Sequence, residues 1–326
     1  MNHRAAAMRG IDGRSRRLRV AVSLRLLVGT ADGLYEIGSD AASTLSGYSV
    51  TSVAGTDGSL WTLLDERLVW HRDPEGAWAE VVGLDELSGN CLISVGTDVL
   101  IGTREAHLLR LSDGALEPVA TFDHVEGRGD WYTPWGGPPD VRSGAVDESG
   151  SIFVNIHVGG IARSDDGGAS WRPTIDFHSD VHEVIAIPGL VLAATARGLA
   201  TSADRGETWA YSTEGLDATY ARAVAVAEDI VLLSASRGPR GDRAAVYRRR
   251  IDSVDPFERC TQGLPGWFEH NIDTACLAAS GTSVAFGTQD GEVYSSEDCG
   301  ATWARVADGL PAVRNVAFAG EALLIE

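Results

Sequence analysis

Short runs of alternating apolar and polar or small residues fill most of the chain, and turns rich in glycine and aspartate separate them. Examples are "LLVGTADGLYEI" (26–37), "LVLAATARGLATS" (190–202) and "TSVAFGTQDGEVYSS" (282–296). Alternation with a period of two, bounded by such turns, is the signal of β-strands joined in hairpins. No stretch shows sustained helical periodicity. The pattern therefore predicts an all-β protein built of short antiparallel strands.

One motif, S-x-D-x-G-x-[ST]-W, occurs three times with no change of spacing, at 164–171, 202–209 and 296–303. Trp171 and Trp209 are 38 residues apart, whereas Trp209 and Trp303 are 94 apart, which leaves room for one unit without the motif. Each unit of roughly 40 residues holds about four predicted strands. A repeat of this size and strand content is typical of a β-propeller blade.

The innermost strand of each blade predicts the number of blades. Seven similar segments are found, "VTSVAG" from Val50, "GNCLISV" from Gly89, "VRSGAV" from Val141, "VHEVIAI" from Val181, "ARAVAV" from Ala221, "IDTACLA" from Ile272 and "VRNVAFA" from Val313. We therefore expect seven four-stranded blades. The last strand should complete the blade that begins near residue 26, which ties the two ends of the chain together and leaves no open sheet edge.

The second position of all seven segments is polar. These residues are Thr51, Asn90, Arg142, His182, Arg222, Asp273 and Arg314. Inner strands of a propeller begin at the top mouth of its central channel, so we expect a ring of these side chains there. Three arginines against one aspartate make the ring cationic and suited to carboxylate, phosphate or sulfate. The alternative is a hydrated channel whose polar lining avoids buried unpaired groups.

The three motifs resemble the Asp-box of BNR-repeat propellers, a group that includes sialidases, xyloglucanases and Ycf48-like assembly factors. The resemblance extends over about residues 24–326 and implies a bacterial member of this sialidase-like, WD40/YVTN/BNR-like superfamily. It also implies that the boxes lie on outer hairpins, away from the central pocket. Their expected roles are structural: the aspartates cap turns, the glycines take positive φ and the tryptophans pack between sheets. The residues concerned are Asp166, Gly168, Trp171, Asp204, Gly206, Trp209, Asp298, Gly300 and Trp303.

Charge and composition exclude several classes of function. The net charge of −19 and the acidic isoelectric point oppose binding to nucleic acids and to anionic membranes. All 27 basic residues are arginine, which excludes a Schiff-base lysine, a pyridoxal anchor and a P-loop lysine. The four cysteines form no C-x-x-C pair, as expected for free thiols in a reducing compartment. We expect a cytoplasmic monomer.

Residues 1–18 are expected to form a flexible arginine-rich extension, and residues 19–326 a single propeller domain. The N-terminal region lacks the apolar run of a signal peptide, and no stretch reaches the length of a membrane helix. The segment 123–141 is expected to be a top-face loop between blades. Its Trp131, Tyr132 and Trp135 are candidate platforms for a sugar or planar ligand.

His157 should end a second strand beside the ring and is a candidate for ligand binding. Four of the eight histidines, His124, His157, His178 and His182, fall between residues 124 and 182, so a histidine-based metal site is conceivable. No H-x-H or helical H-x-x-x-H pattern supports it, so we expect polar lining, with no metal and no cofactor. If the protein is an enzyme, we expect a glycoside hydrolase, with the catalytic candidates Glu183, Tyr220, Asp273 and Asp140.

A sialidase-like member of the family would use an arginine triad, a tyrosine–glutamate pair and an acidic residue. Arg142, Arg222 and Arg314 could form the triad, and Tyr220 with Glu183 the pair. The Arg-Ile-Pro motif of sialidases is absent, however, and those enzymes have six blades. Three functions thus remain open: a propeller that binds a small anionic or polar ligand, an exo-acting glycoside hydrolase, and a scaffold whose top face binds a protein partner.

Overall fold

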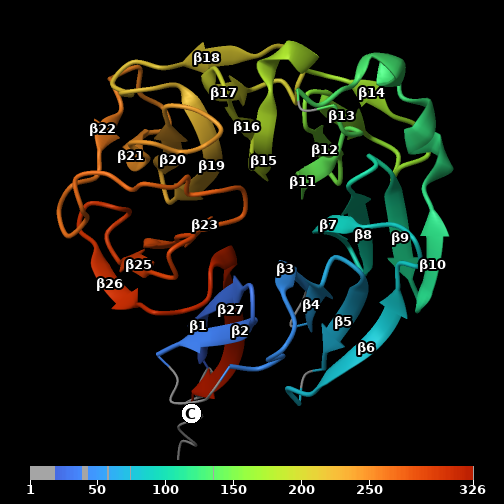
Figure 1. The fold of residues 1–326 in the computed structure, drawn as a ribbon, viewed down its shortest axis with the longest axis horizontal. Coiled ribbons are helices and arrows are strands. Elements are labelled where there is room, and N and C mark those ends of the chain that lie inside the picture. Colours follow the sequence, from blue (N-terminus) through green and yellow to red (C-terminus); the bar gives the residue numbers. More distant parts are fainter. Residues whose placement is uncertain (1–18, 39–42, 57–58, 74, 135, 326) are drawn as a thin grey trace, which may run out of the picture.

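Seven β-sheets are arranged like blades around a central channel in the computed structural model (Figure 1). The structure describes residues 19–38, 43–56, 59–73, 75–134 and 136–325, with side chains at the two ends described only from Leu24 to Gly320. Trp135 and the expected extension 1–18 therefore lie outside the described residues. All sheets are antiparallel, so the predicted seven-bladed propeller is confirmed.

Six blades have four strands each, and the strand named first is the innermost. Blade 1 is β3 (Val50–Thr56), β4 (Ser59–Leu64), β5 (Leu68–Arg72) and β6 (Trp78–Gly83). Blade 2 is β7 (Gly89–Val95), β8 (Asp98–Thr103), β9 (Leu108–Ser112) and β10 (Ala115–Pro118). Blade 3 is β11 (Val141–Val146), β12 (Ile152–Ile156), β13 (Gly160–Ser164) and β14 (Arg172–Pro173).

The next three blades continue the same order. Blade 4 is β15 (Val181–Ile187), β16 (Leu190–Thr195), β17 (Gly198–Ser202) and β18 (Ala210–Ser212). Blade 5 is β19 (Tyr220–Ala227), β20 (Ile230–Ser236), β21 (Ala245–Arg250) and β22 (Glu258–Arg259). Blade 6 is β23 (Leu277–Ser280), β24 (Ser283–Gly287), β25 (Val293–Ser296) and β26 (Ala304–Ala307). Three short 3-10 helices complete the described elements: η1 (Ala120–His124), η2 (Arg128–Asp130) and η3 (Phe177–Ser179).

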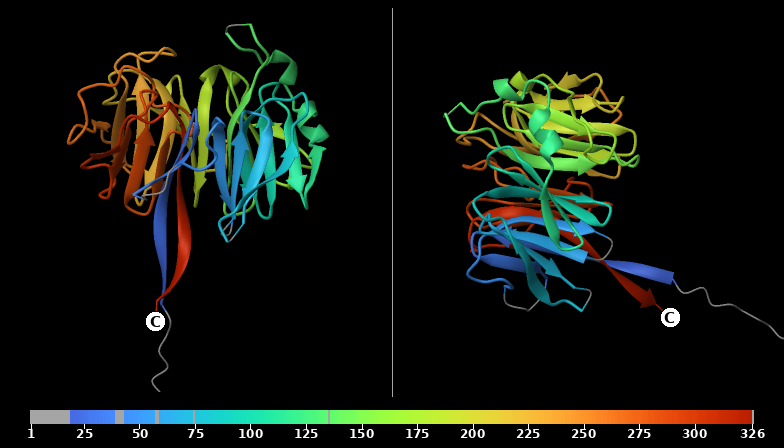
Figure 2. Two further views of the ribbon diagram at one scale, coloured as in Figure 1. Left: turned by 60° about the horizontal axis from the view of Figure 1, so that its bottom comes forward. Right: turned by 90° about the vertical axis from the view of Figure 1, so that its right-hand side faces the viewer.

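Blade 7 joins the two ends of the chain, as the sequence predicted. Its inner strand β27 (Val313–Ile325) pairs with β1 (Arg19–Thr30), which pairs with β2 (Gly33–Ile37). The described residues give this sheet three strands, and Thr44 forms an isolated bridge with Leu34 at its outer edge. The beginning of β1 and the end of β27 pair with each other and continue beyond the propeller as a two-stranded ribbon (Figure 2).

The sequence interpretation of blade 6 was wrong at one point. Its inner strand was expected from Ile272 but begins at Leu277. Residues 273–276 form a turn, closed by a hydrogen bond from Cys276 N to Asp273 O (2.9 Å), and Ala275 has a φ of +61°. The Ala275 N–H is bound by the Glu183 carboxylate (2.8 Å), and its carbonyl accepts from Val316 N (2.8 Å). Both groups therefore bond outside the sheet of blade 6.

The hydrophobic core lies between adjacent blades, and small residues on second strands allow the close approach of the next inner strand. A Cβ placed on Gly102 of β8 would lie 2.3 Å from Cγ1 of Val141 in the next blade. A Cβ on Gly287 of β24 would likewise lie 2.3 Å from Cγ1 of Val313. The threonine after Gly102 accepts a hydrogen bond from His107 N (3.0 Å), which closes the top hairpin. These contacts explain why several second strands end in Gly-Thr.

Each S-x-D-x-G-x-[ST]-W box forms the same compact turn. In the box at 296–303, Ser296 Oγ accepts from Gly300 N (2.9 Å), while Asp298 accepts from Thr302 N (2.8 Å) and from its hydroxyl (2.7 Å). The hydrogen bond from the Thr302 hydroxyl is the main reason that the pKa of Asp298 falls to about 2. The boxes at 164–171 and 202–209 repeat this pattern, and the box glycines all have positive φ.

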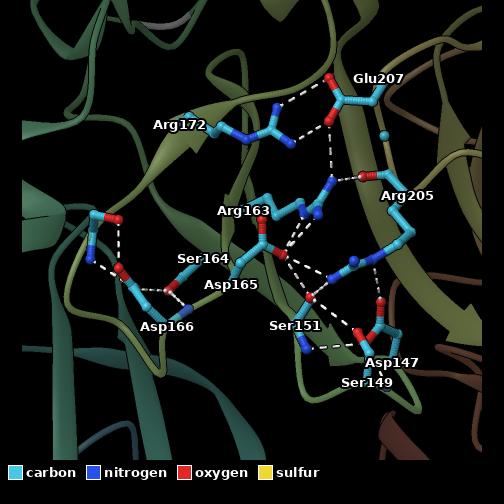
Figure 3. Close-up of polar contacts among 12 residues, drawn as sticks. Asp147, Ser149, Ser151, Arg163, Ser164, Asp165, Asp166, Arg172, Arg205 and Glu207 are labelled. Atoms are coloured by element: carbon cyan, nitrogen blue, oxygen red, sulfur yellow. Dashed lines mark hydrogen bonds and ion pairs between the residues drawn. The ribbon is translucent and has the colours of Figure 1, made fainter.

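Asp165, the first carboxylate of "SDDGGASW", belongs to a separate network that joins blades 3 and 4 (Figure 3). Its Oδ1 accepts from Arg163 Nε (2.7 Å), Ser151 Oγ (2.6 Å) and Arg205 Nη2 (2.8 Å). Arg163 also donates to the Arg205 carbonyl (2.6 Å). Because Arg205 belongs to the second box, this network holds neighbouring outer hairpins together.

Candidate functional site

β-Bulges at the start of the inner strands place the polar ring. In β11, Val141 pairs with Ile156 and Ser143 with Asn155, so Arg142 between them has no partner in the ladder. The same shift occurs in five further inner strands, where it leaves out Thr51, Asn90, His182, Arg222 and Arg314. A bulge adds one residue to one strand and turns its side chain away from the regular alternation. Six of the seven aligned polar positions are thus bulged residues.

A cavity of about 420 Å³ opens at this mouth of the channel. Six of the seven aligned residues line it, namely Thr51, Asn90, Arg142, Arg222, Asp273 and Arg314. His182 does not; it is fully buried in the wall, where its Nδ1 donates to the carbonyl of Ala221 (2.6 Å). Burial lowers the pKa of His182 to about 4, so this ring residue is neutral near pH 7.

The charges of the cavity are largely paired. Arg222 donates to Asp273 (Nε to Oδ1, 2.6 Å), and Arg142 lies against Asp140 (Nε to Oδ2, 3.3 Å). Arg104 forms an ion pair with Glu66 across the rim. Among the described residues, Arg314 forms no ion pair. Four guanidinium groups thus face three carboxylates, which leaves one surplus positive charge at the mouth of a strongly acidic protein.

Arg142 and Arg222 are close enough to affect one another. Burial lowers the pKa of Arg142, the charge of Arg222 lowers it further, and Asp140 opposes the change. A guanidinium in this position is stabilised by any additional anion, because each nearby negative charge offsets both the lost hydration and the repulsion. The site is therefore electrostatically suited to an anion placed between the two side chains.

The expected catalytic pair of Glu183 and Tyr220 is not formed. Both carboxylate oxygens of buried Glu183 accept backbone N–H groups, from Val224 (2.8 Å) and from Ala275 (2.8 Å). Burial raises the pKa of Glu183 to about 7, and these two hydrogen bonds oppose the rise. No hydrogen bond joins Glu183 to Tyr220 in the described part of the chain. Glu183 links the inner regions of blades 4, 5 and 6 and leaves no free oxygen for substrate.

The described aromatic residues of the loop 123–141, Trp131 and Tyr132, do not line the cavity. Trp131 is buried in the core beside Phe122 (ring centroids 6.0 Å apart) and beneath the guanidinium of Arg128, which corrects its expected role as a ligand platform. Tyr132 is 45% exposed but does not line the cavity. A loop that packs its own tryptophan accounts for the glycine- and proline-rich sequence of this insertion.

His157 lies beside the cavity rather than in its lining. Its ring is buried, with Nδ1 3.6 Å from Asp140 Oδ1 and Nε2 3.0 Å from Asp180 Oδ1. Asp140 also accepts from Asn90 Nδ2 (3.4 Å). Asp140 therefore lies between the polar cavity and a buried histidine cluster.

The sequence did not single out several cavity residues. Glu66, Arg104 and Gln289 follow the second strands of their blades, at the tops of the hairpins, while Asn271 and Thr274 lie near the turn before β23. The first three share a signal that the sequence does contain: each is within two residues of the end of a second strand, on the same face as the ring.

No helix among the described residues is long and apolar enough to cross a membrane. No protein-family model matches the chain, and no curated protein matches it by sequence.

Solved structures show similar folds. The GH74 xyloglucanase from Xanthomonas campestris is 16% identical with a TM-score of 0.58, over 87% of this chain and 47% of that one. YCF48 from Cyanidioschyzon merolae is 14% identical with a TM-score of 0.56, over 83% and 94% of the two chains. U3-55K is 16% identical with a TM-score of 0.57, over 81% and 82%. At these identities the similarity shows the fold: the chain is a propeller related in architecture to glycoside hydrolase and YCF48 propellers.

Proposed function

We propose that the cavity at the channel mouth binds a small anionic or polar ligand, such as a carboxylate, a phosphate or an acidic sugar. The observation that carries this proposal is the meeting of Arg142, Arg222 and Arg314, each on its own bulge, at one cavity of about 420 Å³. The volume suits a small molecule. Arginine forks bind carboxylate and phosphate oxygens in pairs.

Arg314 is the expected first contact of the ligand, because it forms no ion pair among the described residues. Arg222 is held by Asp273 and stays available at the cavity wall. An anion that binds both would gain charge-assisted hydrogen bonds, worth about 1.5–3 kcal/mol each. Losing one arginine should therefore weaken binding by about 10- to 100-fold.

Calorimetric titration of the full chain with inorganic phosphate, succinate and glucuronic acid tests the proposal. The variants Arg314→Gln and Arg222→Gln should weaken binding of whichever probe the wild type binds. Arg250→Gln is the matched control, since it removes the same charge from an exposed pair with Asp229 and Asp252 on the outer rim. If no probe binds, or if all three variants bind like the wild type, the proposal is wrong.

The geometry gives less support to a glycoside hydrolase. Hydrolysis needs two carboxyl groups facing the substrate, or a tyrosine nucleophile paired with an acid. Asp140 and Asp273 each lie against an arginine, and both oxygens of Glu183 are bonded to backbone. We expect no release of chromophore from aryl glycosides or aryl sialosides. Turnover that is lost in Asp273→Asn would favour the hydrolase instead.

A protein-binding scaffold is the remaining alternative. The fold similarity to YCF48, which extends over nearly all of that chain, is compatible with such a role. The large exposed apolar side chains of the described residues are scattered, however: Leu24, Tyr132, Val254 and Val306. A partner surface is expected to show a contiguous patch, so the polar cavity favours the small ligand.

A further inference from the structure

A buried cluster of two histidines and one aspartate lies beside the cavity, where blades 3 and 4 meet. His157 follows β12, Asp180 precedes β15, and His182 is the bulged residue of β15. One potential ligand atom from each of the three lies within 4.8 Å of the other two, and the described residues hold no second such group. Both imidazoles are buried, while Asp180 is 24% exposed and gives access from the surface.

The separations within the cluster match those of a tetrahedral metal site. Asp180 Oδ1 lies 3.0 Å from His157 Nε2 and 3.5 Å from His182 Nε2. Zinc–ligand bonds of about 2.0–2.1 Å at tetrahedral angles place neighbouring donor atoms about 3.3 Å apart. The two edges at Asp180 lie on either side of that value, and the third, between the two histidines, is at most 4.8 Å. The carboxylate and each imidazole are therefore spaced as ligands of one ion.

The hydrogen bond on the far side of His182 determines what its Nε2 can do. Nδ1 lies 2.6 Å from the carbonyl oxygen of Ala221, which only accepts, so Nδ1 carries the proton. Nε2 of the neutral ring is then an acceptor that faces the carboxylate of Asp180, another acceptor. Nε2 of His182 is shielded from solvent and makes no hydrogen bond. A buried imidazole lone pair that faces a carboxylate is unfavourable unless a proton or a cation lies between the two groups.

The surroundings resemble the outer shell of a metal site. Histidine ligands usually turn their second ring nitrogen to a carbonyl or a carboxylate, which fixes the ring orientation. His182 does this with the Ala221 carbonyl, and Nδ1 of His157 faces the Asp140 carboxylate at 3.6 Å. The Tyr220 ring packs against His182, with centroids 4.6 Å apart, and shields it from the side of the channel.

We propose that His157, Asp180 and His182 bind a divalent transition-metal ion of the zinc class, through both Nε2 atoms and the aspartate carboxylate. Nitrogen and carboxylate donors in this number suit Zn²⁺, with a fourth position left for water or another oxygen donor. The ion would join blades 3 and 4 beside the cavity. The site does not depend on the proposed anion ligand, because none of its three ligands lines the cavity.

The test uses the full chain, stripped with a chelator and dialysed against Zn²⁺. We expect one bound ion per chain by elemental analysis, a higher unfolding temperature with Zn²⁺, and an anomalous scattering peak between the three side chains in crystals grown with Zn²⁺. The variants His157→Gln and Asp180→Asn should weaken binding by more than the about 10- to 100-fold that outer-shell substitutions cost.

His107→Gln is the matched control. His107 faces Asp123 in a similar pair (Nδ1 to Oδ1, 2.7 Å) but has no second histidine ligand, so this variant should bind Zn²⁺ like the wild type. Binding to the wild type decides the question even if a variant fails to fold. Absence of a stoichiometric ion, or an anomalous peak elsewhere, would overturn the proposal and leave a direct contact between His157 Nε2 and Asp180 as the role of the cluster. Equal loss of Zn²⁺ in His107→Gln would also overturn it.

Discussion

Replacing Asp165 by alanine should destabilise the propeller although its carboxylate lies on the outer surface. Asp165 Oδ1 accepts three hydrogen bonds, from Arg163, Arg205 and Ser151, at 2.6 to 2.8 Å (Figure 3). Arg163 is the critical partner, because its side chain is only 6% exposed. Alanine at position 165 would leave that guanidinium largely buried without its nearest carboxylate.

The magnitude follows from the unequal burial of the two partners. Removing one member of a fully buried pair costs about 3–5 kcal/mol, whereas an exposed pair contributes about 0–1 kcal/mol. Asp165 is 45% exposed, and Arg163 keeps the Arg205 carbonyl (2.6 Å) and Glu207 (3.3 Å). We therefore expect Asp165→Ala to lower the free energy of unfolding by about 2 kcal/mol, a value between the two limits. With an unfolding entropy of about 2.1 cal/mol/K per residue, this loss corresponds to about 3 °C in a 326-residue chain.

Urea unfolding followed by tryptophan fluorescence measures this loss, with Asp252→Ala as the control. Asp252 pairs with Arg250, and both side chains are exposed, so its removal should leave the unfolding midpoint nearly unchanged. In high salt, any cost of Asp252→Ala should shrink, while that of Asp165→Ala should largely persist because Arg163 is buried. Equal unfolding midpoints for the two variants would refute the argument from burial.

Three further outcomes follow from the structure. Gly102→Ala should lower the free energy of unfolding in urea by about 1–3 kcal/mol, since its Cβ would lie 2.3 Å from Val141. Gly266→Ala, with no neighbour within 4 Å, should leave it unchanged. Equal effects of the two variants would contradict the packing argument. Glu183→Gln should lower the free energy of unfolding by about 1–3 kcal/mol, because the glutamine NH₂ must face one of two backbone N–H donors. An unchanged unfolding midpoint would mean that the Glu183 carboxyl group is already protonated. The pKa of Asp298 is lowered to about 2, chiefly by the box threonine hydroxyl, so its contribution to stability should be complete above the ordinary value of 3.8 and disappear as the pH falls through 2. Acid titrations of wild type and Asp298→Ala should therefore converge below pH 2, and a gap that persists there would contradict this assignment.

Much of the fold could be predicted from the sequence because each blade is specified locally. Period-two alternation and turn residues act over a few positions, and the Asp-boxes repeat a turn whose hydrogen bonds stay within one hairpin. The start of β23 could not be predicted in this way. The run before Leu277 alternates like a strand, but the N–H of Ala275 bonds to Glu183, 92 residues away. A contact at that distance along the chain leaves no trace in a local pattern.

The candidate site, too, could be predicted from the sequence only in part. Aligned polar positions in repeated strands predicted six side chains that line the cavity at the channel mouth, because equivalent positions of a propeller meet around its axis. They did not show that His182 is buried in the wall. Only the closed ring decided which charges cancel, that Arg314 forms no ion pair within the described part of the chain, and that buried Trp131 belongs to the core. It also brought His157 to Asp180 and His182 across a blade boundary. Periodicity determines the direction of a side chain within its blade, whereas the partners it meets depend on packing between blades.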